Sequence, residues 1–532
     1  MYFSKGVLWT NLTFSMTKVS KNLFILVLIS FFSIIYAQTV KEVSILHWND
    51  FHARNEPYKI SKKDTVSGET MYYYVGGTGS MLGYLNKYRT PESLVLNAGD
   101  DFQGTPISNF TRGKSQIELM NLYNVDAFVI GNHEFDYSQY SLDSSLQTAN
   151  FPVLSANVYM SSRNSLMAKP YITKEIGGVK FGIIGITLPE LFETSLPSNV
   201  TDIIMLNTDS VINVGINELK SQSCDVIVLL SHCGVEEDKL LAEKYYKDID
   251  IIVGGHSHTP LFRPKIVNGV FIVQAGSYSR WLGKLDIKVE TAGDTVISAY
   301  GSLIETVLDS SVIDLPASQK VDAMISMYAP QLKQVIGQLE SDWKASYSEE
   351  SNLGQFEADA FRQKTGSDIA FINGGGLRKS LLKGEIMVGD IWEINPFGNT
   401  VQTFSVSGKT IRQMITNYIM IKLEKEKTGE RIDILQPSGL SYSYDSKKAA
   451  ERSGDFIISL NLGRSDIQDD QTYTIATNNY IVSQFKKFFG DVGENIDAKD
   501  TGWLDRDLII EAVKEMKVIN TVLEKRIVDV SK

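Results

Sequence analysis

The chain has 532 residues, which is too long for a single hydrophobic core, so we expect two substantial domains and a connection between them. Hydrophobic residues make up 43% and charged residues 22% of the chain, as in ordinary globular proteins. The net charge of -11 argues against a nucleic-acid duplex or an acidic membrane held by bulk electrostatics, so an anionic substrate would need a local cation such as a bound metal.

Residues 1–37 are typical of a secretory signal peptide. Lys18 and Lys21 precede an apolar run over Leu23–Ile35, and the small Ala37 stands at the expected cleavage point. Met16 lies just ahead of this unit and is an alternative start. Because the run is short for a membrane span, we expect cleavage and export to the periplasm or cell surface, with no transmembrane anchor afterwards. An uncleaved anchor is the alternative interpretation.

Between residues 41 and 306, short β-branched runs repeatedly end in polar, glycine-containing loops. The instances are VSILHWNDFH, LVLNAGDD, AFVIGNHEFD, KFGIIGIT, DVIVLLSHCG and DIDIIVGGHSHT. Continuous apolar runs of this length predict strands buried on both faces, with helices between them. Polar clusters at the carboxyl ends of such strands are where ligands bind in open α/β folds. This stretch is therefore predicted to be an α/β domain with a binding site at its loops.

The two cysteines, Cys224 and Cys233, flank the predicted strand VIVLL. An extended segment of that length holds their α-carbons too far apart for a disulfide. We interpret Cys233 as a buried bystander rather than a nucleophile. The exported chain is therefore not expected to depend on disulfides.

A connection and a second domain follow. Apolar residues at helical spacing between Leu315 and Asp342 predict one helix, with Pro330 permitting a kink. We assign residues 313–345 to this interdomain helix and linker. Residues 346–532 then form a second domain that mixes helices and strands.

All six histidines fall in the first domain. His47 is expected on a strand and is interpreted as structural, whereas the other five come from four loops that we place at the same edge of one sheet. Three loops also deliver Asp50, Asp100 and Asn132. Imidazole and carboxylate groups gathered this way suit Zn²⁺, Mn²⁺, Co²⁺ or Fe rather than Ca²⁺ or a lone Mg²⁺.

The ordered set D-x-H, G-D, G-N-H-E, H and G-H-x-H, each after an apolar strand, resembles the calcineurin-like metallophosphoesterase superfamily. The stretches AGDDFQGTP and GNHEFD are similar to its 5′-nucleotidase branch in particular. The resemblance implies an α/β fold: an N-terminal four-layer α/β/β/α sandwich, a linker helix, and a smaller α+β C-terminal domain that binds substrate. It also implies two divalent metal ions, the first held by Asp50, His52 and His258 and the second by Asn132, His232 and His256, with Asp100 bridging them.

Two divalent ions about 4 Å apart suit displacement at phosphorus, since they polarise phosphoryl oxygens and lower the pKa of a bound water. No serine or cysteine nucleophile is then required. In this interpretation His133 is not a ligand but stabilises charge on the phosphoryl group or leaving oxygen and donates a proton. Asp136 would orient its ring. The alternative role for Asp136 is a carboxylate at a helix N-terminus.

The resemblance continues in the second domain, where NGGGLR and NPFGNTV each follow a predicted strand. In the family these motifs supply a nucleoside site. Carried over, they imply substrate contacts from Asn373, Gly375 and Arg378, and a base held between the rings of Phe397 and Tyr480. Arginine grips phosphate in forked geometry, and stacking between two rings tolerates different bases.

Two departures from the family pattern stand out. A G-G-D-G turn whose aspartate bonds the ribose usually follows the second aromatic residue, whereas this chain reads SQFKKFFGDVGENID, with Asp491 as the candidate replacement. An arginine that often precedes the segment matching SNLGQF is also missing, and Lys344 is the nearest cation.

The sequence thus predicts an exported dinuclear-metal phosphohydrolase whose partner is a small molecule, a nucleoside 5′-monophosphate or a related phosphoester. The alternatives among enzymes are a 2′,3′-cyclic nucleotide phosphodiesterase, a nucleotide-sugar pyrophosphatase and a thiosulfohydrolase-type relative. A surface protein that binds nucleotides without catalysis is an alternative of another class, disfavoured because the set of ligands is complete.

Overall fold

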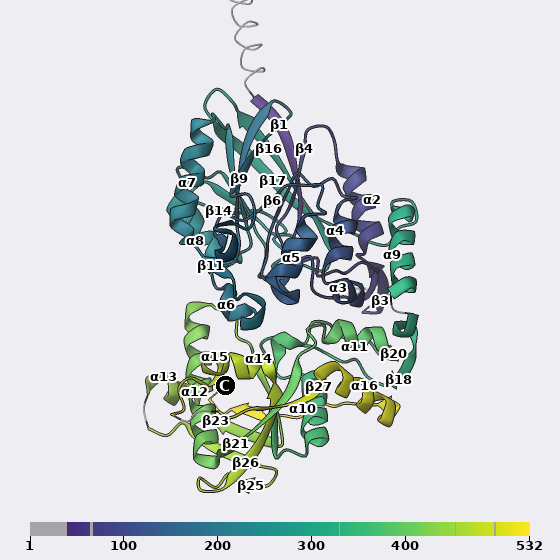
Figure 1. The fold of residues 1–532 in the computed structure, drawn as a ribbon, viewed down its shortest axis with the longest axis vertical. Coiled ribbons are helices and arrows are strands. Elements are labelled where there is room, and N and C mark those ends of the chain that lie inside the picture. The colour runs from purple at the N-terminus through teal and green to yellow at the C-terminus, as the bar shows by residue number, and fades with distance from the viewer. Residues whose placement is uncertain (1–39, 64–67, 329, 453, 494–495, 532) are drawn as a thin grey trace, which may run out of the picture.

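The computed structural model describes residues 40–63, 68–328, 330–452, 454–493 and 496–531, so the predicted signal peptide lies outside the described residues. Figure 1 shows two domains, one above the other, joined at one side by α9 (Leu315–Tyr328). Within the described ranges, no helix is long and apolar enough to cross a membrane.

The N-terminal domain is built on two six-stranded sheets. The first has the order β17 (Thr295–Glu305), β16 (Trp281–Glu290), β1 (Val40–Trp48), β4 (Ser93–Asn97), β5 (Ala127–Val129), β6 (Val153–Leu154). The second has the order β14 (Lys265–Val267), β15 (Val270–Val273), β13 (Ile251–Val253), β12 (Val226–Ser231), β10 (Val179–Ile186), β9 (Tyr171–Ile176). In the first sheet β1, β4, β5 and β6 pair in parallel, and in the second β10, β12, β13 and β15 do so, as expected for continuous apolar runs.

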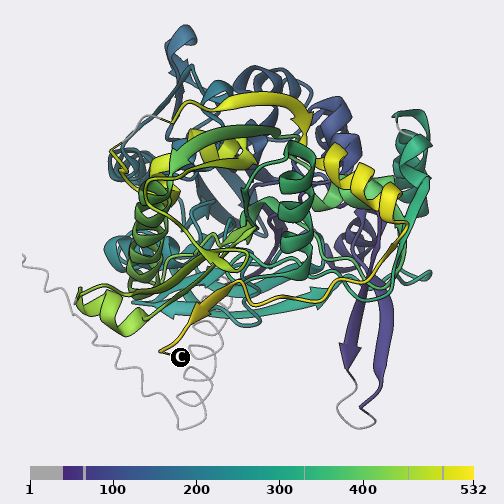
Figure 2. The ribbon, with the colours of Figure 1, turned by 90° about the horizontal axis from the view of Figure 1, so that it is seen from below.

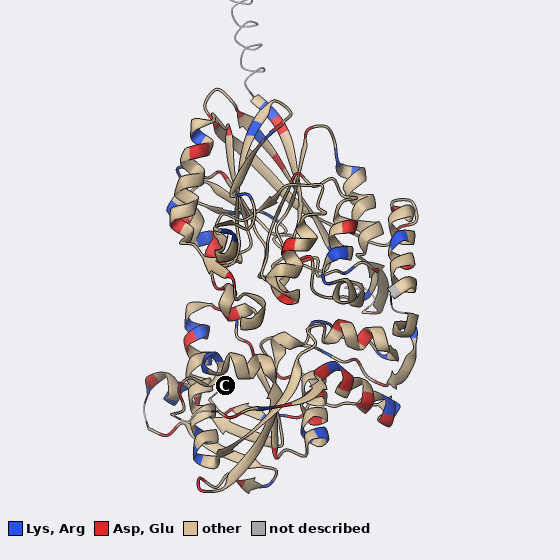
Figure 3. Ribbon diagram, viewed as in Figure 1, with Lys and Arg blue, Asp and Glu red and all other residues tan. Residues whose placement is uncertain are grey.

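The two sheets pack face to face, and helices cover both outer faces. A single core cluster contains Ile45 and Leu96 of the first sheet together with Ile183 and Val228 of the second. Helices α2 (Thr78–Tyr88), α4 (Lys114–Met120) and α5 (Gln139–Leu146) pack on the first sheet. Helices α7 (Thr208–Ser221) and α8 (Val235–Tyr245) pack on the second. The predicted four-layer α/β/β/α sandwich is confirmed. Figure 3 shows charged residues on these outer helices and few on the central strands.

The connection between the domains differs from the prediction. Helix α9 ends at Tyr328, a 3₁₀ turn covers Pro330–Lys333, and β18 (Val335–Leu339) follows. The expectation of one helix reaching Asp342 is therefore wrong. Proline lacks the N–H that continues a helix and disfavours helical geometry before it. The apolar run after it pairs with β20 (Gly384–Met387) and β28 (Val518–Ile519), inside the C-terminal domain.

The C-terminal domain is α+β. Its five-stranded sheet has the order β22 (Leu435–Ser438), β19 (Ile369–Asn373), β26 (Thr472–Asn478), β21 (Thr400–Ser407), β27 (Lys499–Leu504). A four-stranded sheet contains β25 (Ser465–Asp466), β24 (Ile457–Leu462), β23 (Leu440–Tyr444) and β29 (Ile527–Asp529). The main helices are α10 (Asn352–Thr365), α11 (Val388–Ile394), α12 (Gly408–Thr428) and α16 (Asp505–Met516). Figure 2, seen from below, also shows the hairpin β2 (Tyr58–Lys63) and β3 (Thr70–Val75) standing out from the body.

Candidate metal centre and substrate site

The predicted ligands come together at the carboxyl ends of strands from both sheets of the N-terminal domain. β1, β4 and β5 of the first sheet lead into Asp50, Asp100 and Asn132, and β12 and β13 of the second lead into His232 and His256. The expected four histidine loops are present, but the expectation of one sheet is wrong: together with the Asp100 loop they come from two sheets. An apolar run shows that a strand is buried but not which of two packed sheets it joins.

The first group consists of Asp50, His52 and His258, whose ligand atoms all lie within 4.8 Å of one another. Asp50 Oδ1 lies 3.2 Å from His258 Nε2, and the Nε2 atoms of the two histidines are 3.0 Å apart. The backbone carbonyl of Gln103 lies 3.0 Å from His52 Nδ1 and directs Nε2 into the centre. Burial lowers the pKa of both imidazoles, which keeps them neutral as ligands.

Asp100, His232 and His256 form the second group. His232 Nδ1 donates to the carbonyl of Ala98 at 2.6 Å, which leaves Nε2, 2.9 Å from Asp100 Oδ2, as the ligand atom. Asn132 Oδ1 lies 3.0 Å from His256 Nδ1 and completes the predicted set. Burial lowers the pKa of His232, but the carboxylates of Asp100 and Asp50 and the hydrogen bonds of the ring together outweigh it and raise the value to about 10. The same negative field attracts a divalent cation, which takes the place of the proton.

The donor set fits divalent metals on its own chemistry. Asp50 Oδ1 and His232 Nε2 are buried and face other predicted ligands, His258 Nε2 at 3.2 Å and Asp100 Oδ2 at 2.9 Å, so a cation bound between these ligands would offset the cost of burying them. Neutral imidazoles with carboxylates suit Zn²⁺, Mn²⁺, Co²⁺ or Fe. Asp50, Asp100, Asn132 and the four histidines therefore form two neighbouring candidate metal sites.

The backbone around these ligands is unusual. Five of the predicted ligands adopt positive φ: Asp50 (50°), His52 (51°), Asp100 (61°), His256 (71°) and His258 (55°). Residues other than glycine rarely adopt this region, and such strain concentrates at functional sites. Gly255 is required beside them because an added Cβ would lie 2.7 Å from His232 Nδ1. The sharp turn through GGHSHT thus sends His256 to one group and His258 to the other.

Glu134 connects two of the metal loops and was not singled out from the sequence. Its carboxylate accepts hydrogen bonds from the backbone N–H groups of Asp100, Asp101, Phe102 and Gly131, at 2.6 to 3.2 Å. Burial raises the pKa of Glu134 to about 7, and the backbone bonds oppose that rise. The glutamate of G-N-H-E was visible in the motif, but its partners could not be inferred without the fold.

His133 and Asp136 form the predicted pair. His133 Nδ1 lies 2.8 Å from Asp136 Oδ2, and its ring lies 5.1 Å from that of His52. Burial lowers the pKa of His133, but Asp136 and Asp100 raise it above its ordinary value overall. Nδ1 is held by Asp136, so Nε2 is the ring atom that remains available to a substrate.

The C-terminal domain reaches this centre. Arg378 Nη2 lies 3.1 Å from His52 Nε2, and the Phe397 ring lies 5.8 Å from the ring of His133. Nε2 has a single lone pair, so it cannot accept from Arg378 and bind a cation at the same time. Further contacts hold the domains together, including the ring contact of Phe110 with Trp392 at 4.8 Å.

The other predicted substrate residues divide into two sets. The first set lies on one side of the C-terminal domain and consists of Asn373, Gly375 and Tyr480. A side-chain hydrogen bond of 3.1 Å joins Asn373 to Asn478, which is two residues before Tyr480. Asp491 does not join them. It is exposed, its carboxylate accepts from the N–H of Gly493, and its carbonyl accepts from Asn417 of α12.

His47 and the two cysteines, which the sequence analysis placed outside the chemistry, are all buried. His47 is 2% exposed on β1, and burial lowers its pKa to about 3. Cys224 and Cys233 are both free and buried, and burial raises the pKa of the Cys233 thiol well above its ordinary value. A thiol held in its protonated form is a poor nucleophile.

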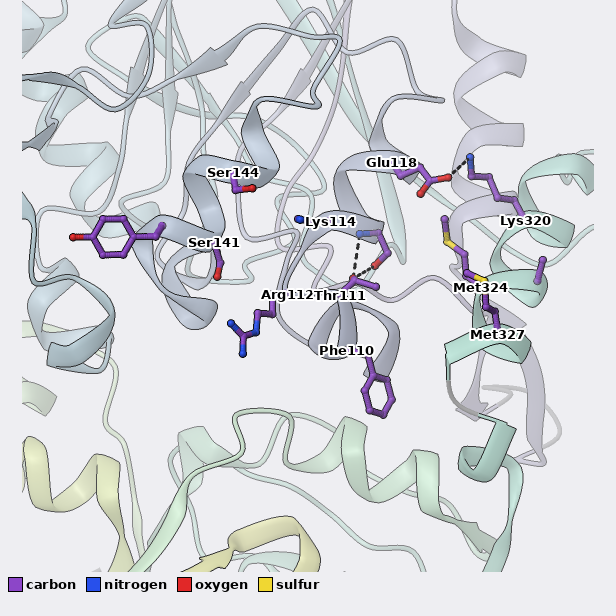
Figure 4. Close-up of a pocket in the computed structure, with 13 residues that line it drawn as sticks. Phe110, Thr111, Arg112, Lys114, Glu118, Ser141, Ser144, Lys320, Met324 and Met327 are labelled. Atoms are coloured by element: carbon purple, nitrogen blue, oxygen red, sulfur yellow. Dashed lines mark hydrogen bonds and ion pairs between the residues drawn. The ribbon is translucent and has the colours of Figure 1, made fainter. Parts of the chain in front are cut away.

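A cavity of about 850 Å³ lies away from the ligands, among α3 (Pro106–Thr111), α4, α5 and α9 (Figure 4). Phe110, Arg112, Tyr140 and Met327 line it, and the ion pair of Lys320 with Glu118 lies at its wall. None of the predicted metal, catalytic or substrate residues lines this cavity. The convergence of ligands, rather than cavity size, locates the candidate site.

Comparison with known proteins agrees with the geometry. Residues 43–260 match the calcineurin-like phosphoesterase family, and residues 334–491 match the 5′-nucleotidase C-terminal domain. The chain is 28% identical over 537 residues to a 5′-nucleotidase of Diplobatis ommata, covering 91% of this chain and 89% of that protein. It is 27% identical over 498 residues to an endonuclease of Bacillus subtilis, where the match spans 88% of this chain but 39% of the longer protein.

A solved structure shows the same arrangement over both domains. The structure of a 5′-nucleotidase precursor from Thermus thermophilus superposes with a TM-score of 0.80 at 30% identity, covering 92% of this chain and all of that one. The two domain matches, the 30% identity to this solved structure and the two candidate metal sites all indicate the same family. The chain belongs to the 5′-nucleotidase family of metal-dependent phosphoester hydrolases.

Proposed function

We propose that this protein is an exported dinuclear-metal phosphohydrolase that converts nucleoside 5′-monophosphates to nucleoside and phosphate. One observation carries the proposal: two largely buried ligand groups lie side by side, with the N–H of His256 bound to Asp50, and Arg378 of the other domain reaches them. A pair of cations with an arginine suits a dianionic phosphoryl group. The base-stacking pair, Phe397 and Tyr480, belongs to the same domain as Arg378 and supports a nucleoside as the leaving group.

In this proposal each residue has a separate task. The metals, when bound, polarise the phosphoryl oxygens and activate water. Arg378 grips the phosphoryl oxygens and orients the group. His133 holds a proton at Nε2 for the leaving oxygen, and Asp136 keeps the ring in the required tautomer through Nδ1. Phe397 and Tyr480 hold the base, and Asn373 and Gly375 shape the loop between base and phosphate.

The test is a substrate panel on protein reconstituted with Zn²⁺, Mn²⁺, Co²⁺ or Fe²⁺. We expect phosphate release to be most efficient from AMP, compared with 2′,3′-cyclic AMP, UDP-glucose, glucose 6-phosphate and thiosulfate-bearing substrates. His232→Ala should abolish it, while Cys233→Ala, changed at the neighbouring position, should retain it. Faster turnover of a cyclic nucleotide or a nucleotide sugar would replace the proposed substrate. Fully metallated protein that hydrolyses none of them would be a binding protein.

Export is tested separately, because its support is the sequence of residues 1–37. We expect the mature protein recovered from outside the cytoplasm to begin near Gln38, as read by N-terminal sequencing. A mature chain that retains Leu23–Ile35 would show that the segment is an anchor.

A further inference from the structure

The loop between α12 and β22 places Asp433 against the NGGG loop. β22 pairs antiparallel with β19, with Leu435 opposite Asn373, so the residues just before β22 lie beside the glycines that follow β19. Asp433 Oδ2 accepts from Asn373 Nδ2 at 3.0 Å, and Oδ1 accepts from the N–H of Gly375 at 2.7 Å. Two residues predicted to contact substrate are thus both bound to an aspartate that the family motifs do not include.

This arrangement changes what the loop offers to a ligand. The N–H of Gly375 and the amide N–H of Asn373 donate to Asp433, and Asn373 Oδ1 accepts from Asn478. A carboxylate has about four acceptor positions, of which these donors occupy two. The Asp433 carboxylate therefore keeps acceptor capacity at this loop, beside the second amide N–H of Asn373.

Asp433 is held without a direct counter-charge. Within the described ranges it forms no ion pair, although Lys487 and Arg431 are near enough to lower its pKa. Burial is the larger influence and raises the pKa of the carboxyl. A half-buried carboxylate whose direct partners are neutral costs stability, and such groups gather at functional sites.

Tyr347 and Asp433 both lie against Gly375, because an added Cβ there would be 2.9 Å from Tyr347 Cε2 and 3.0 Å from Asp433 Oδ2. After burial, the charge of Asp433 is the largest influence that raises the pKa of both Tyr347 and Tyr480. Tyr480 is the expected stacking residue, and Arg378, which extends from the same loop to His52, also acts on Tyr347. Asp433 therefore acts electrostatically on the ring that would hold the base, and it binds the loop that carries the arginine that would hold the phosphate.

We propose that Asp433 is a substrate-binding residue that accepts hydrogen bonds from the hydroxyl groups of a sugar in the leaving group. It takes the role that the sequence suggested for Asp491, whose carboxylate binds the N–H of Gly493 in its own turn. The inference rests on the proposed function and adds the group that recognises the sugar. It predicts a preference for leaving groups whose sugar carries free 2′- and 3′-hydroxyl groups.

The experiment compares kcat/KM for AMP, 2′,3′-dideoxy-AMP and p-nitrophenyl phosphate in the metal-loaded full chain. For the parent enzyme, we expect AMP to be preferred over the dideoxy analogue by about 10- to 100-fold, the range for a hydrogen bond to a charged group. In Asp433→Ala, we expect AMP to fall to the level of the dideoxy analogue, so that the ratio of AMP to p-nitrophenyl phosphate falls by the same factor. Asp470→Ala, an exposed aspartate of the same domain, is the matched control.

Four results would overturn the inference. The parent could treat AMP and its dideoxy analogue alike, or Asp433→Ala could retain the preference. An equal fall for all three substrates would make Asp433 a support for the loop. Loss of the preference in Asp491→Ala instead would return the role to that residue. If the parent hydrolyses p-nitrophenyl phosphate but not AMP, the proposed function fails and this inference fails with it; the other results leave the proposed function intact.

Discussion

Gly131 contacts the metal centre without supplying a ligand, and replacing it with alanine should displace Asp100. An added Cβ at this position would lie 2.8 Å from the backbone nitrogen of Asp100 and 2.9 Å from its carboxyl carbon, and closer still to Oδ1. Ordinary contacts begin at 3.4 Å, so the backbone and carboxylate of Asp100 must move by at least about half an ångström. Oδ1 cannot simply rotate away, since it accepts the N–H of His133 at 2.8 Å.

Binding and catalytic groups must be held within about 0.5 Å of their productive positions, and a displacement of about 1 Å can reduce turnover about 100-fold. For Gly131→Ala we therefore expect metal affinity and kcat each to fall by about 10- to 100-fold. Overpacking should also cost about 1–3 kcal/mol of unfolding free energy.

Metal titration of the apo-protein, steady-state kinetics and guanidinium denaturation measure the three quantities. Gly293→Ala is the matched control, because its added Cβ would meet its nearest atoms at 3.5 and 3.8 Å. A Gly131→Ala enzyme that binds metal and turns over substrate like the parent would refute the placement of Asp100.

Three further predictions concern the catalytic pair, the base clamp and a buried carboxyl. Asp136→Asn removes the charge that raises the pKa of His133, so the high-pH limb of the kcat profile should move to lower pH. The value of kcat at neutral pH should fall by about 100-fold or more. An unchanged profile would contradict the pairing of these two residues. Tyr480→Ala should raise the KM for AMP by about 5- to 100-fold, the range for one stacked base. Tyr480→Phe keeps the ring and loses only the hydrogen bond from the hydroxyl to the carbonyl of Glu193, so its KM should stay within about threefold of the parent's. Equal effects of the two changes would argue against stacking. Burial raises the pKa of Asp505 from 3.8 to about 7, so the folded state holds this proton more tightly than the unfolded chain and its contribution to stability is lost as pH rises from about 4 to 7. Asp505→Asn should flatten the unfolding free energy over that window, and a parallel curve for the variant would contradict the assignment.

Much of the metal centre could be predicted because its information is local. Each ligand follows an apolar strand by a few residues, and the carboxyl ends of parallel strands meet at one side, so D-x-H or G-H-x-H predicts a direction as well as a chemistry. What the pattern lacked was the sheet to which each strand belongs. Burial on both faces looks alike in either sheet of a sandwich, and the five-loop convergence follows from packing rather than from any one segment.

Elsewhere the local pattern was misleading or silent. The apolar spacing after Pro330 suited a helix, but strand partners far along the chain, at residues 384–387 and 518–519, decided otherwise. The positive φ of Asp50 and Asp100 could not be predicted from residue type alone, although aspartate adopts this region more often than most residues. Asp433 belongs to no motif, and its contact with Asn373 depends on the register of β22 with β19, which the sequence does not reveal.

The metal sites themselves are tested most directly by anomalous diffraction from crystals of the metal-loaded protein, supported by elemental analysis. We predict two ions per chain, one among Asp50, His52 and His258 and the other among Asn132, His232 and His256, with Asp100 beside both. A single ion, or ions bound at other residues while these seven remain empty, would contradict the dinuclear centre.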